Sequence, residues 1–314
     1  MQNCNEKSEY LIIGAGIIGL AIAREIKSRK PNAKIIILDK EKNAGLHASG
    51  RNSGVLHAGF YYHEDSLKAK FTRDGNQEMT EYCKLHKIKV NQSGKLVVTR
   101  NESELETLEL LATRSKHNNS GAYIIDESKA SNLEPNAKTY KHALYSPFTS
   151  SINPIDVVKC LVEELTNDGV VFQFGSGFKG KIDDNTVLTN DNKVFRANLI
   201  INTAGLYADV VAKQFGASLK YTILPFKGVY LKYTGNDQPL KMQVYPVPNI
   251  DNPFLGVHFT VTSDGYTKIG PTAIPAFWRE NYGGFDNFEI DEFLNILGIE
   301  AKLLAKNSFN LNIS

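Results

Sequence analysis

Three glycines near the N-terminus have the spacing of a phosphate-binding turn. Gly14, Gly16 and Gly19 form a G-x-G-x-x-G pattern directly after a short apolar run. In such a pattern the first glycine makes a tight turn, the second lets the backbone approach a pyrophosphate, and the third lets a helix pack on the strand. The phosphates would lie at the first helical N–H groups, those of Ile17 and Ile18, at the positive end of the helix dipole. We therefore expect a bound dinucleotide.

A carboxylate stands where a ribose hydroxyl would need an acceptor. Asp39 ends a second apolar run, 35–38, and lies about 20 residues beyond Gly19, the usual spacing in such sites. Between the two runs apolar residues recur at helical spacing, and Pro31 follows a basic last turn. These features predict a strand, helix, strand unit in a mixed α/β fold. The alternative is a glycine-rich turn in some other α/β protein.

Composition narrows the class of protein. The 314 residues suggest two domains, and 36 basic against 34 acidic side chains give no reason to expect a nucleic-acid partner. Cys4, Cys83 and Cys160 are far apart, which argues against a disulfide framework and against a zinc site, so we expect no metal. No apolar run approaches the ~18 residues of a membrane span. We expect a cytoplasmic protein, with peripheral membrane contact as an alternative.

Periodicity predicts the remaining elements. Helices are expected at 67–86, 105–112 and 154–165, apolar strands at 170–174 and 195–202, and an antiparallel pair at 179–182 and 186–188. From Tyr221 the chain consists of short β-rich segments with Gly and Pro, one of them at 253–260.

A glycine-rich polar segment, 43–63, carries the most specific pattern. Its run from Asn52 to Tyr62 reads N-S-G-V-L-H-A-G-F-Y-Y, and residues 203–209 read T-A-G-L-Y-A-D. The first run resembles the L-2-hydroxyglutarate oxidase and dehydrogenase flavoproteins of the D-amino-acid-oxidase-like superfamily, where a closely similar run lines the flavin. The second is similar to another glycine turn of that superfamily that passes close to the cofactor. The resemblance extends from about Tyr10 to the region 285–297.

The resemblance implies FAD as the cofactor and a two-domain architecture. We expect a Rossmann-type FAD-binding domain formed by 1–85 and 145–220, a β-rich substrate domain formed by 86–144 and 221–300, and a tail, 301–314. The residues expected to contact FAD are Gly14, Gly16, Ile17, Ile18, Gly19, Asp39, Lys40, Ser49, Asn52, Ser53, Gly54, Val55, Val171, Ala204 and Gly205.

The resemblance further implies oxidation of L-2-hydroxyglutarate to 2-oxoglutarate, with electrons passed to oxygen or a quinone. His57 could take the proton of the substrate hydroxyl, because the pKa of a histidine lies near working pH. The alternative is a histidine that only holds the loop. Lys227, Tyr245 and His258 are the candidates for binding a dicarboxylate, or else ordinary sheet side chains. Lys227 stands where the family often has arginine, so it offers a point charge instead of a two-pronged clamp.

Other functions stay open. The substrate could be another small 2-hydroxy acid or an amino acid. The chain ends at Ser314 without the segment that in the family returns to the nucleotide-binding domain and helps hold the isoalloxazine ring. A second hypothesis is therefore a catalytically impaired FAD-binding protein whose pocket another chain completes. An NAD-dependent dehydrogenase is disfavoured, because the run 52–62 resembles a flavin-lining loop. No pattern predicts the oligomeric state.

Overall fold

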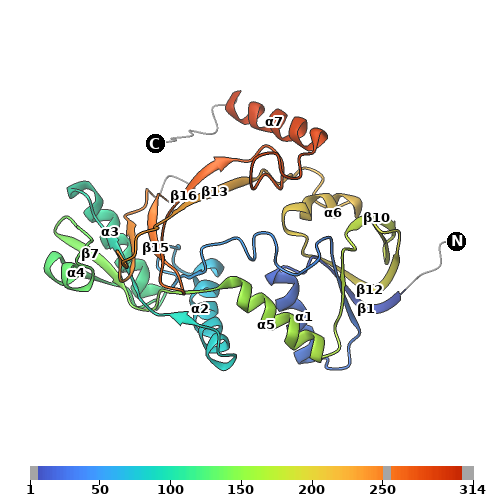
Figure 1. Ribbon diagram of the computed structural model, residues 1–314, viewed down its shortest axis with the longest axis horizontal. Helices are drawn as coiled ribbons and strands as arrows, with labels where there is room; N and C mark the ends of the chain where they lie inside the picture. The colour runs from blue at the N-terminus through green and yellow to red at the C-terminus, as the bar shows by residue number, and fades with distance from the viewer. Residues whose placement is uncertain (1–5, 250–255, 306–314) are drawn as a thin grey trace. The chain divides into compact units, whose positions relative to one another are not determined.

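The structure, a computed structural model, describes residues 6–249 and 256–305 (Figure 1). It divides into two compact units. Unit 1 comprises 1–51, 158–227 and 274–314, and unit 2 comprises 52–157 and 228–273. In the described ranges no helix is both long enough and apolar enough to cross a bilayer.

Unit 1 is built on a six-stranded sheet with the strand order β10-β11-β12-β1-β2-β9. Its parallel strands are β1 (Glu6–Ile13), β2 (Ile35–Asp39), β9 (Val171–Phe174) and β12 (Val194–Asn202), and its antiparallel edge is formed by β10 (Phe178–Asp183) and β11 (Thr186–Thr189). The central strands are apolar along their length because both faces are covered: Leu11, Ile12 and Leu38 are fully buried. This confirms the predicted strands and the antiparallel pair.

Helices place the glycine turn beside this sheet. Helix α1 (Ile17–Arg29) starts directly after Gly16 and joins β1 to β2, which confirms the predicted strand, helix, strand unit. Helix α5 (Pro154–Asn167) lies beside α1, with Arg24 of α1 and Glu164 of α5 in an ion pair of 2.7 Å (Figure 1). The other helices of unit 1 are η2 (Gly205–Tyr207), α6 (Ala208–Gln214) and α7 (Ile290–Ala305).

A seven-stranded sheet, β13-β16-β15-β14-β5-β7-β6, contributes most of its residues to unit 2. The strands are β5 (Lys95–Val98), β6 (Tyr123–Asp126), β7 (His142–Ser146), β13 (Phe226–Lys232), β14 (Gln243–Pro246), β15 (His258–Val261) and β16 (Thr267–Pro275). A second sheet has the order β3-β8-β4 and consists of β3 (Val55–Leu56), β4 (Val90–Asn91) and β8 (Ser150–Ile152). Of the β-rich segment predicted at 253–260, the part 253–255 lies outside the described residues.

Four helical segments complete unit 2: α2 (Leu67–Leu85), η1 (Glu102–Glu104), α3 (Leu105–His117) and α4 (Glu127–Leu133). Leu108 and Leu111 of α3 pack in one cluster with Val97 of β5 and Leu144 of β7, so the helix covers one face of the sheet. The helices predicted at 67–86 and 105–112 are confirmed. The second continues to His117, because residues 113–117 contain neither glycine nor proline.

The compact units do not follow the boundaries expected for the FAD-binding and substrate domains. Residues 52–85 and 145–157 lie in unit 2, since β3 and β4 both pair with β8. Residues 274–300 lie in unit 1, where Arg279 pairs with Asp209. The division of cofactor and substrate functions between segments remains a prediction.

Candidate functional site

The turn after β1 can be formed only by glycine. Gly14 has a φ of +109°, and a Cβ atom there would lie 2.4 Å from the carbonyl oxygen of Thr203. The Gly14 N–H donates to the Leu38 carbonyl at 2.8 Å, and the Thr203 N–H donates to the Ile13 carbonyl at 2.9 Å. These bonds hold together the carboxyl ends of three parallel strands, β1, β2 and β12, which is where ligands bind in open α/β sheets.

The start of α1 points donors into this turn. Gly16 caps the helix without a side chain, and the Ile17 N–H donates to Ser49 Oγ at 2.9 Å. The first amides of a helix have no partner within the helix, so they favour an anion such as a pyrophosphate. Ile18 is exposed, whereas Gly19 is buried against Gly14. Ser49, predicted from the second glycine-rich segment, thus lies at the first turn.

Asp39 closes the turn from the end of β2. Its Oδ2 accepts from the Ala15 N–H at 2.7 Å, and its Oδ1 accepts from the Glu41 N–H at 2.8 Å. Burial raises the pKa of Asp39, although both backbone donors favour the carboxylate. A glycine cradle, helix amides and a half-buried carboxylate together fit the phosphates and ribose of a dinucleotide.

The other predicted cofactor residues of unit 1 lie on neighbouring elements. Ala204 and Gly205 follow β12 directly, at the same sheet edge as Gly14. Val171 pairs with Ile36, which precedes the carboxyl end of β2. The backbone contacts to a cofactor expected of these residues remain a prediction.

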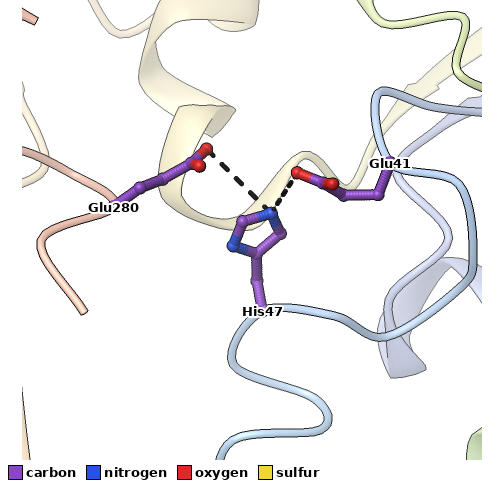
Figure 2. A group of neighbouring side chains, drawn as sticks. All are labelled: Glu41, His47 and Glu280. Atoms are coloured by element: carbon purple, nitrogen blue, oxygen red, sulfur yellow. Dashed lines mark hydrogen bonds and ion pairs between the residues drawn. The ribbon is translucent and has the colours of Figure 1, made fainter. Parts of the chain in front are cut away.

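Lys40 belongs to an ion-pair network that the sequence did not indicate. Figure 2 shows Glu41, His47 and Glu280, whose ligand-type atoms lie within 4.8 Å of one another. His47 Nε2 is 2.9 Å from Glu41 Oε1, and Lys40 contacts both Glu41 and Glu280, the latter at 2.6 Å. The Tyr207 hydroxyl donates to Glu280 at 2.8 Å.

Burial disfavours the charged form of Glu280, yet hydrogen bonds from Lys40 and Tyr207 hold its pKa below the ordinary value. Two carboxylates therefore share the single positive charge of Lys40, and His47 lies close to both of them. A divalent ion could bind here only by displacing Lys40, so we assign the network the role of fastening residue 280 to the end of β2 within unit 1.

Lys227, a candidate for substrate binding, also lies in unit 1. Its Nζ donates to Asn281 Oδ1 at 3.0 Å, and Asn281 Nδ2 donates to the Gly284 carbonyl at 3.2 Å. The other three candidates, His57, Tyr245 and His258, all lie in unit 2.

The sheet of unit 2 brings Tyr245 and His258 together. Strands β14 and β15 are antiparallel with Val244 opposite Phe259, which sets Tyr245 opposite His258. Their rings are stacked, with centroids 3.7 Å apart and planes at 20°. His258 Nδ1 lies 2.8 Å from the Gly256 carbonyl, which can only accept, so Nδ1 carries the proton and Nε2 the lone pair.

Two further residues join this cluster that were not among the predicted site residues. Lys95 is fully buried, and its Nζ lies 3.4 Å from His57 Nδ1 and 3.7 Å from the centroid of the Tyr245 ring. The hydroxyl of Tyr61 is buried without a hydrogen-bond partner among the described residues. We call His57, Tyr61, Lys95, Tyr245 and His258 the histidine–lysine cluster.

Burial dominates the electrostatics of the histidine–lysine cluster. It lowers the pKa of Lys95 to about 7. Burial, Lys95 and His258 together hold the pKa of His57 well below its ordinary value. Burial also lowers the pKa of His258 to about 4, against the hydrogen bond to Gly256. Both imidazoles are thus neutral at pH 7, and the cluster is able to accept a proton.

Strand alternation does not single out Lys95. Lys95 and Val97 share one face of β5, but Leu96 on the other face is equally buried, so both faces of the strand are covered. Tyr61 lies inside the segment 52–62 that carries the family resemblance, but nothing in the sequence distinguishes it from the neighbouring residues as a member of the site.

The loop before His57 is held by contacts within unit 2. Gly54 has a φ of +73°, and a Cβ atom there would lie 2.1 Å from the Ile152 carbonyl oxygen. Asn52 Oδ1 accepts from the Gly54 N–H at 2.8 Å, and Val55 pairs with Ser151. Ser53 is half-buried between them. The flavin contacts expected of residues 52–55 remain a prediction.

Comparison with known proteins places this geometry in a family. Residues 9–298 match the family described as FAD dependent oxidoreductase. L-2-hydroxyglutarate dehydrogenase of Caenorhabditis briggsae is 36% identical over 98% of this chain and 73% of the relative's length. The protein of that name from Escherichia coli K12 is 32% identical over 92% of this chain and 69% of its own length.

Solved structures agree with the fold. L-alpha-glycerophosphate oxidase of Mycoplasma pneumoniae, determined with FAD bound, superimposes with a TM-score of 0.76 at 26% identity, covering 94% of this chain and 78% of that one. Glycine oxidase of Geobacillus kaustophilus has a TM-score of 0.75 at 20% identity, covering 95% and 78%. With its glycine cradle, its fold and this match over most of its length, the chain belongs to the family of FAD-dependent oxidoreductases.

Proposed function

We propose that this FAD-dependent oxidoreductase oxidises L-2-hydroxyglutarate to 2-oxoglutarate. The observation that carries the proposal is the histidine–lysine cluster, which offers neutral nitrogen bases in a buried setting. The names of relatives at 32 to 36% identity supply the substrate. Oxidising a hydroxy acid requires a hydride acceptor and a proton acceptor. The chemistry that FAD supplies when bound is hydride acceptance from carbon.

The cofactor is held by residues of the glycine turn. The start of α1, where Ser49 Oγ accepts from the Ile17 N–H, would hold the pyrophosphate, and the Asp39 carboxylate would accept from a ribose hydroxyl. Ala204 and Gly205 supply a second backbone approach at the same sheet edge. Lys40, Ser49 and the loop 52–55 are further proposed contacts.

The proton is taken by His57. Its ring is neutral at pH 7 and half-buried, so it can be reached while water is largely excluded. The unpaired hydroxyl of Tyr61 and the lone pair of His258 Nε2 are groups that hydrogen-bond to the substrate's polar atoms. Tyr245 packs against both Lys95 and His258 and fixes their positions. Lys227 is a further proposed partner for a substrate carboxylate.

The test is steady-state turnover with an artificial electron acceptor and a panel of substrates. L-2-hydroxyglutarate should give the highest kcat/KM, above D-2-hydroxyglutarate, L-lactate, glycerol 3-phosphate and glycine. A preference for lactate or glycerol 3-phosphate would replace the proposed substrate by another small alcohol, and a preference for glycine would replace it by an amine. Turnover of none of them would support the impaired FAD-binding alternative.

Oxygen or a quinone is the proposed natural electron acceptor. An oxygen electrode distinguishes the two, because oxygen consumption without added acceptor should equal product formation only if oxygen is used. Oxidation that needs a quinone analogue, and that accelerates when lipid vesicles carry it, would point to a quinone and to contact with a membrane surface.

A further inference from the structure

Lys95 is a buried lysine without an ion-pair partner in the described part of the chain. Its side chain is 0% exposed, and among the described residues no carboxylate forms an ion pair with it. Its Nζ lies 3.4 Å from His57 Nδ1. A buried ammonium without a counter-ion is costly, so the surroundings favour the neutral amine.

The groups that face Lys95 are aromatic or imidazole. Tyr61 and His57 come from the segment after β3, Tyr245 from β14 and His258 from β15, and the Tyr61 ring centroid is 5.4 Å from Nζ. None of these side chains is negatively charged at pH 7, because burial raises the pKa of both tyrosines well above its ordinary value. The faces of two tyrosine rings provide only a weak cation–π attraction.

The protonation of Lys95 limits which nitrogen of His57 can carry the hydrogen. An ammonium can only donate to Nδ1, which leaves the imidazole proton on Nε2, and that nitrogen then has no lone pair. A neutral amine has a lone pair and can accept from the Nδ1–H, which leaves the imidazole lone pair on Nε2. Only the second arrangement lets Nε2 act as a base.

We infer that Lys95 is a positioning residue, which as a neutral amine accepts a hydrogen bond from His57 Nδ1–H and leaves His57 Nε2 free to take the substrate's hydroxyl proton. This inference rests on the proposed function. In the step concerned the substrate O–H bond breaks and an N–H bond forms at Nε2. The imidazolium then donates its Nδ1–H to Lys95, which spreads the new positive charge over two residues. The proton leaves to solvent after product release.

The first test is the pH profile of kcat for Lys95→Met. Wild-type kcat should rise as pH increases through about 7, because the amine must lose its proton first. Lys95→Met should lower kcat at pH 8 on the order of 100-fold with little change in KM, and should lose the limb near pH 7. A profile that keeps this limb in Lys95→Met would overturn the inference.

Two controls separate positioning from packing. Lys268→Met removes a lysine of β16 whose Nζ lies 5.5 Å from the Tyr266 ring centroid, and it should leave kcat and its pH profile unchanged. His57→Asn combined with Lys95→Met should be no slower than His57→Asn alone, because Lys95 acts through His57. Additive losses would contradict this. Thermal melting and FAD content report whether each variant folds.

A second readout needs neither substrate nor variant. In wild-type holoenzyme with ¹⁵N-labelled histidine, the His57 resonances at pH 8 should show a protonated Nδ1 and an unprotonated Nε2. The reverse tautomer at pH 8 would overturn the inference even if the enzyme is active. The enzyme could instead show the expected tautomer but fail to oxidise L-2-hydroxyglutarate. That result would refute the proposed substrate and leave the pairing of Lys95 with His57 intact.

Discussion

At the scale of single residues, the cluster in unit 2 depends on which atoms hold protons. Lys95, His57 and His258 are all shifted toward their neutral forms, chiefly by burial. Substitutions here are therefore expected to change proton transfer more than cofactor binding, because the glycine turn and Asp39 belong to unit 1.

Replacing the proposed base tests this separation. His57→Asn keeps a hydrogen-bonding side chain but removes the basic nitrogen, so kcat with L-2-hydroxyglutarate should fall about 10²- to 10⁴-fold. FAD content, measured from the ratio of visible to ultraviolet absorbance, should stay as in the wild type. A variant that retains full kcat would show that His57 only holds its loop.

The acceptor proposed for the ribose gives a second residue-scale prediction. In the wild type, the two oxygens of Asp39 each accept from one backbone N–H group, that of Ala15 or that of Glu41. Asp39→Asn removes the negative charge and leaves only one side-chain oxygen to accept. A charged hydrogen bond contributes about 1.5 to 3 kcal/mol, so the Kd for FAD should rise about 10- to 100-fold. Quenching of flavin fluorescence on binding measures this. Asp168→Asn, an exposed position of unit 1, is the control; equal affinity in both variants would argue against a ribose contact.

The residue-scale predictions from the sequence succeed where a pattern is local. The glycine turn and Asp39 could be predicted because spacing along one strand, helix, strand unit defines them. His57, Tyr245 and His258 are indicated only by resemblance. Lys95 meets His57 through pairing between distant segments, so its role could not be derived from its own neighbours in the chain. The flavin contacts of these segments remain predictions.

At the scale of elements, a buried ion pair fastens the segment after β16 within unit 1. Arg279 Nη1 and Nη2 donate to the two oxygens of Asp209 at 2.8 and 3.0 Å, and Arg279 Nε lies 3.0 Å from Glu292 of α7. Arg279 and Asp209 are both buried. The pair connects α6 with the chain leading into α7.

Breaking this pair should be costly. Arg279→Met removes the bidentate partner of the buried Asp209 carboxylate and leaves it the more distant Lys213 Nζ, at 3.6 Å, as its cationic partner, which is expected to lower the free energy of unfolding by about 3 to 5 kcal/mol. Urea denaturation followed by circular dichroism measures the change. Arg29→Met, at an exposed pair with Glu25, should cost less than about 1 kcal/mol. An equal loss of unfolding free energy in the two variants would show that the buried pair stabilises the protein no more than the exposed pair does.

The same pair predicts a pH dependence. Burial favours the neutral acid, yet hydrogen bonds from Arg279 and the backbone lower the pKa of Asp209 to about 2 from 3.8. A lowered pKa means stabilisation that is complete above about pH 4 and is lost as pH falls toward 2, amounting to about 2 kcal/mol. The difference in unfolding free energy between wild type and Asp209→Asn should shrink over this range. A constant difference would contradict the assigned pKa.

Elements with strong periodicity were predictable and those defined by pairing were not. Helix α2 begins at Leu67, directly after Ser66, whose side-chain oxygen accepts from the Ala69 N–H, and its apolar spacing is visible in the sequence. Strands β3 and β4 have two residues each and exist because both pair with β8. The antiparallel order of β14 and β15, which stacks Tyr245 on His258, likewise depends on contacts across the sheet.

At the scale of the whole molecule, each compact unit carries a different part of the proposed reaction. Unit 1 has the geometry for a dinucleotide, and unit 2 has the groups that accept a proton. The fold class, a mixed α/β protein of the FAD-dependent oxidoreductases, could be predicted because two short motifs define it. The bounds of the two units could not be predicted from the sequence, since they follow from strand pairing between distant segments. The chain spans 73% of the length of its Caenorhabditis briggsae relative.

The most direct test is a visible absorption spectrum of the purified protein reconstituted with FAD, recorded without oxygen before and after adding L-2-hydroxyglutarate at pH 8. We predict an oxidised flavin spectrum that bleaches on addition of this substrate and remains unchanged with glycine. A bound flavin that stays oxidised with L-2-hydroxyglutarate would contradict the proposed reaction. A protein that binds no FAD would contradict the cofactor site itself.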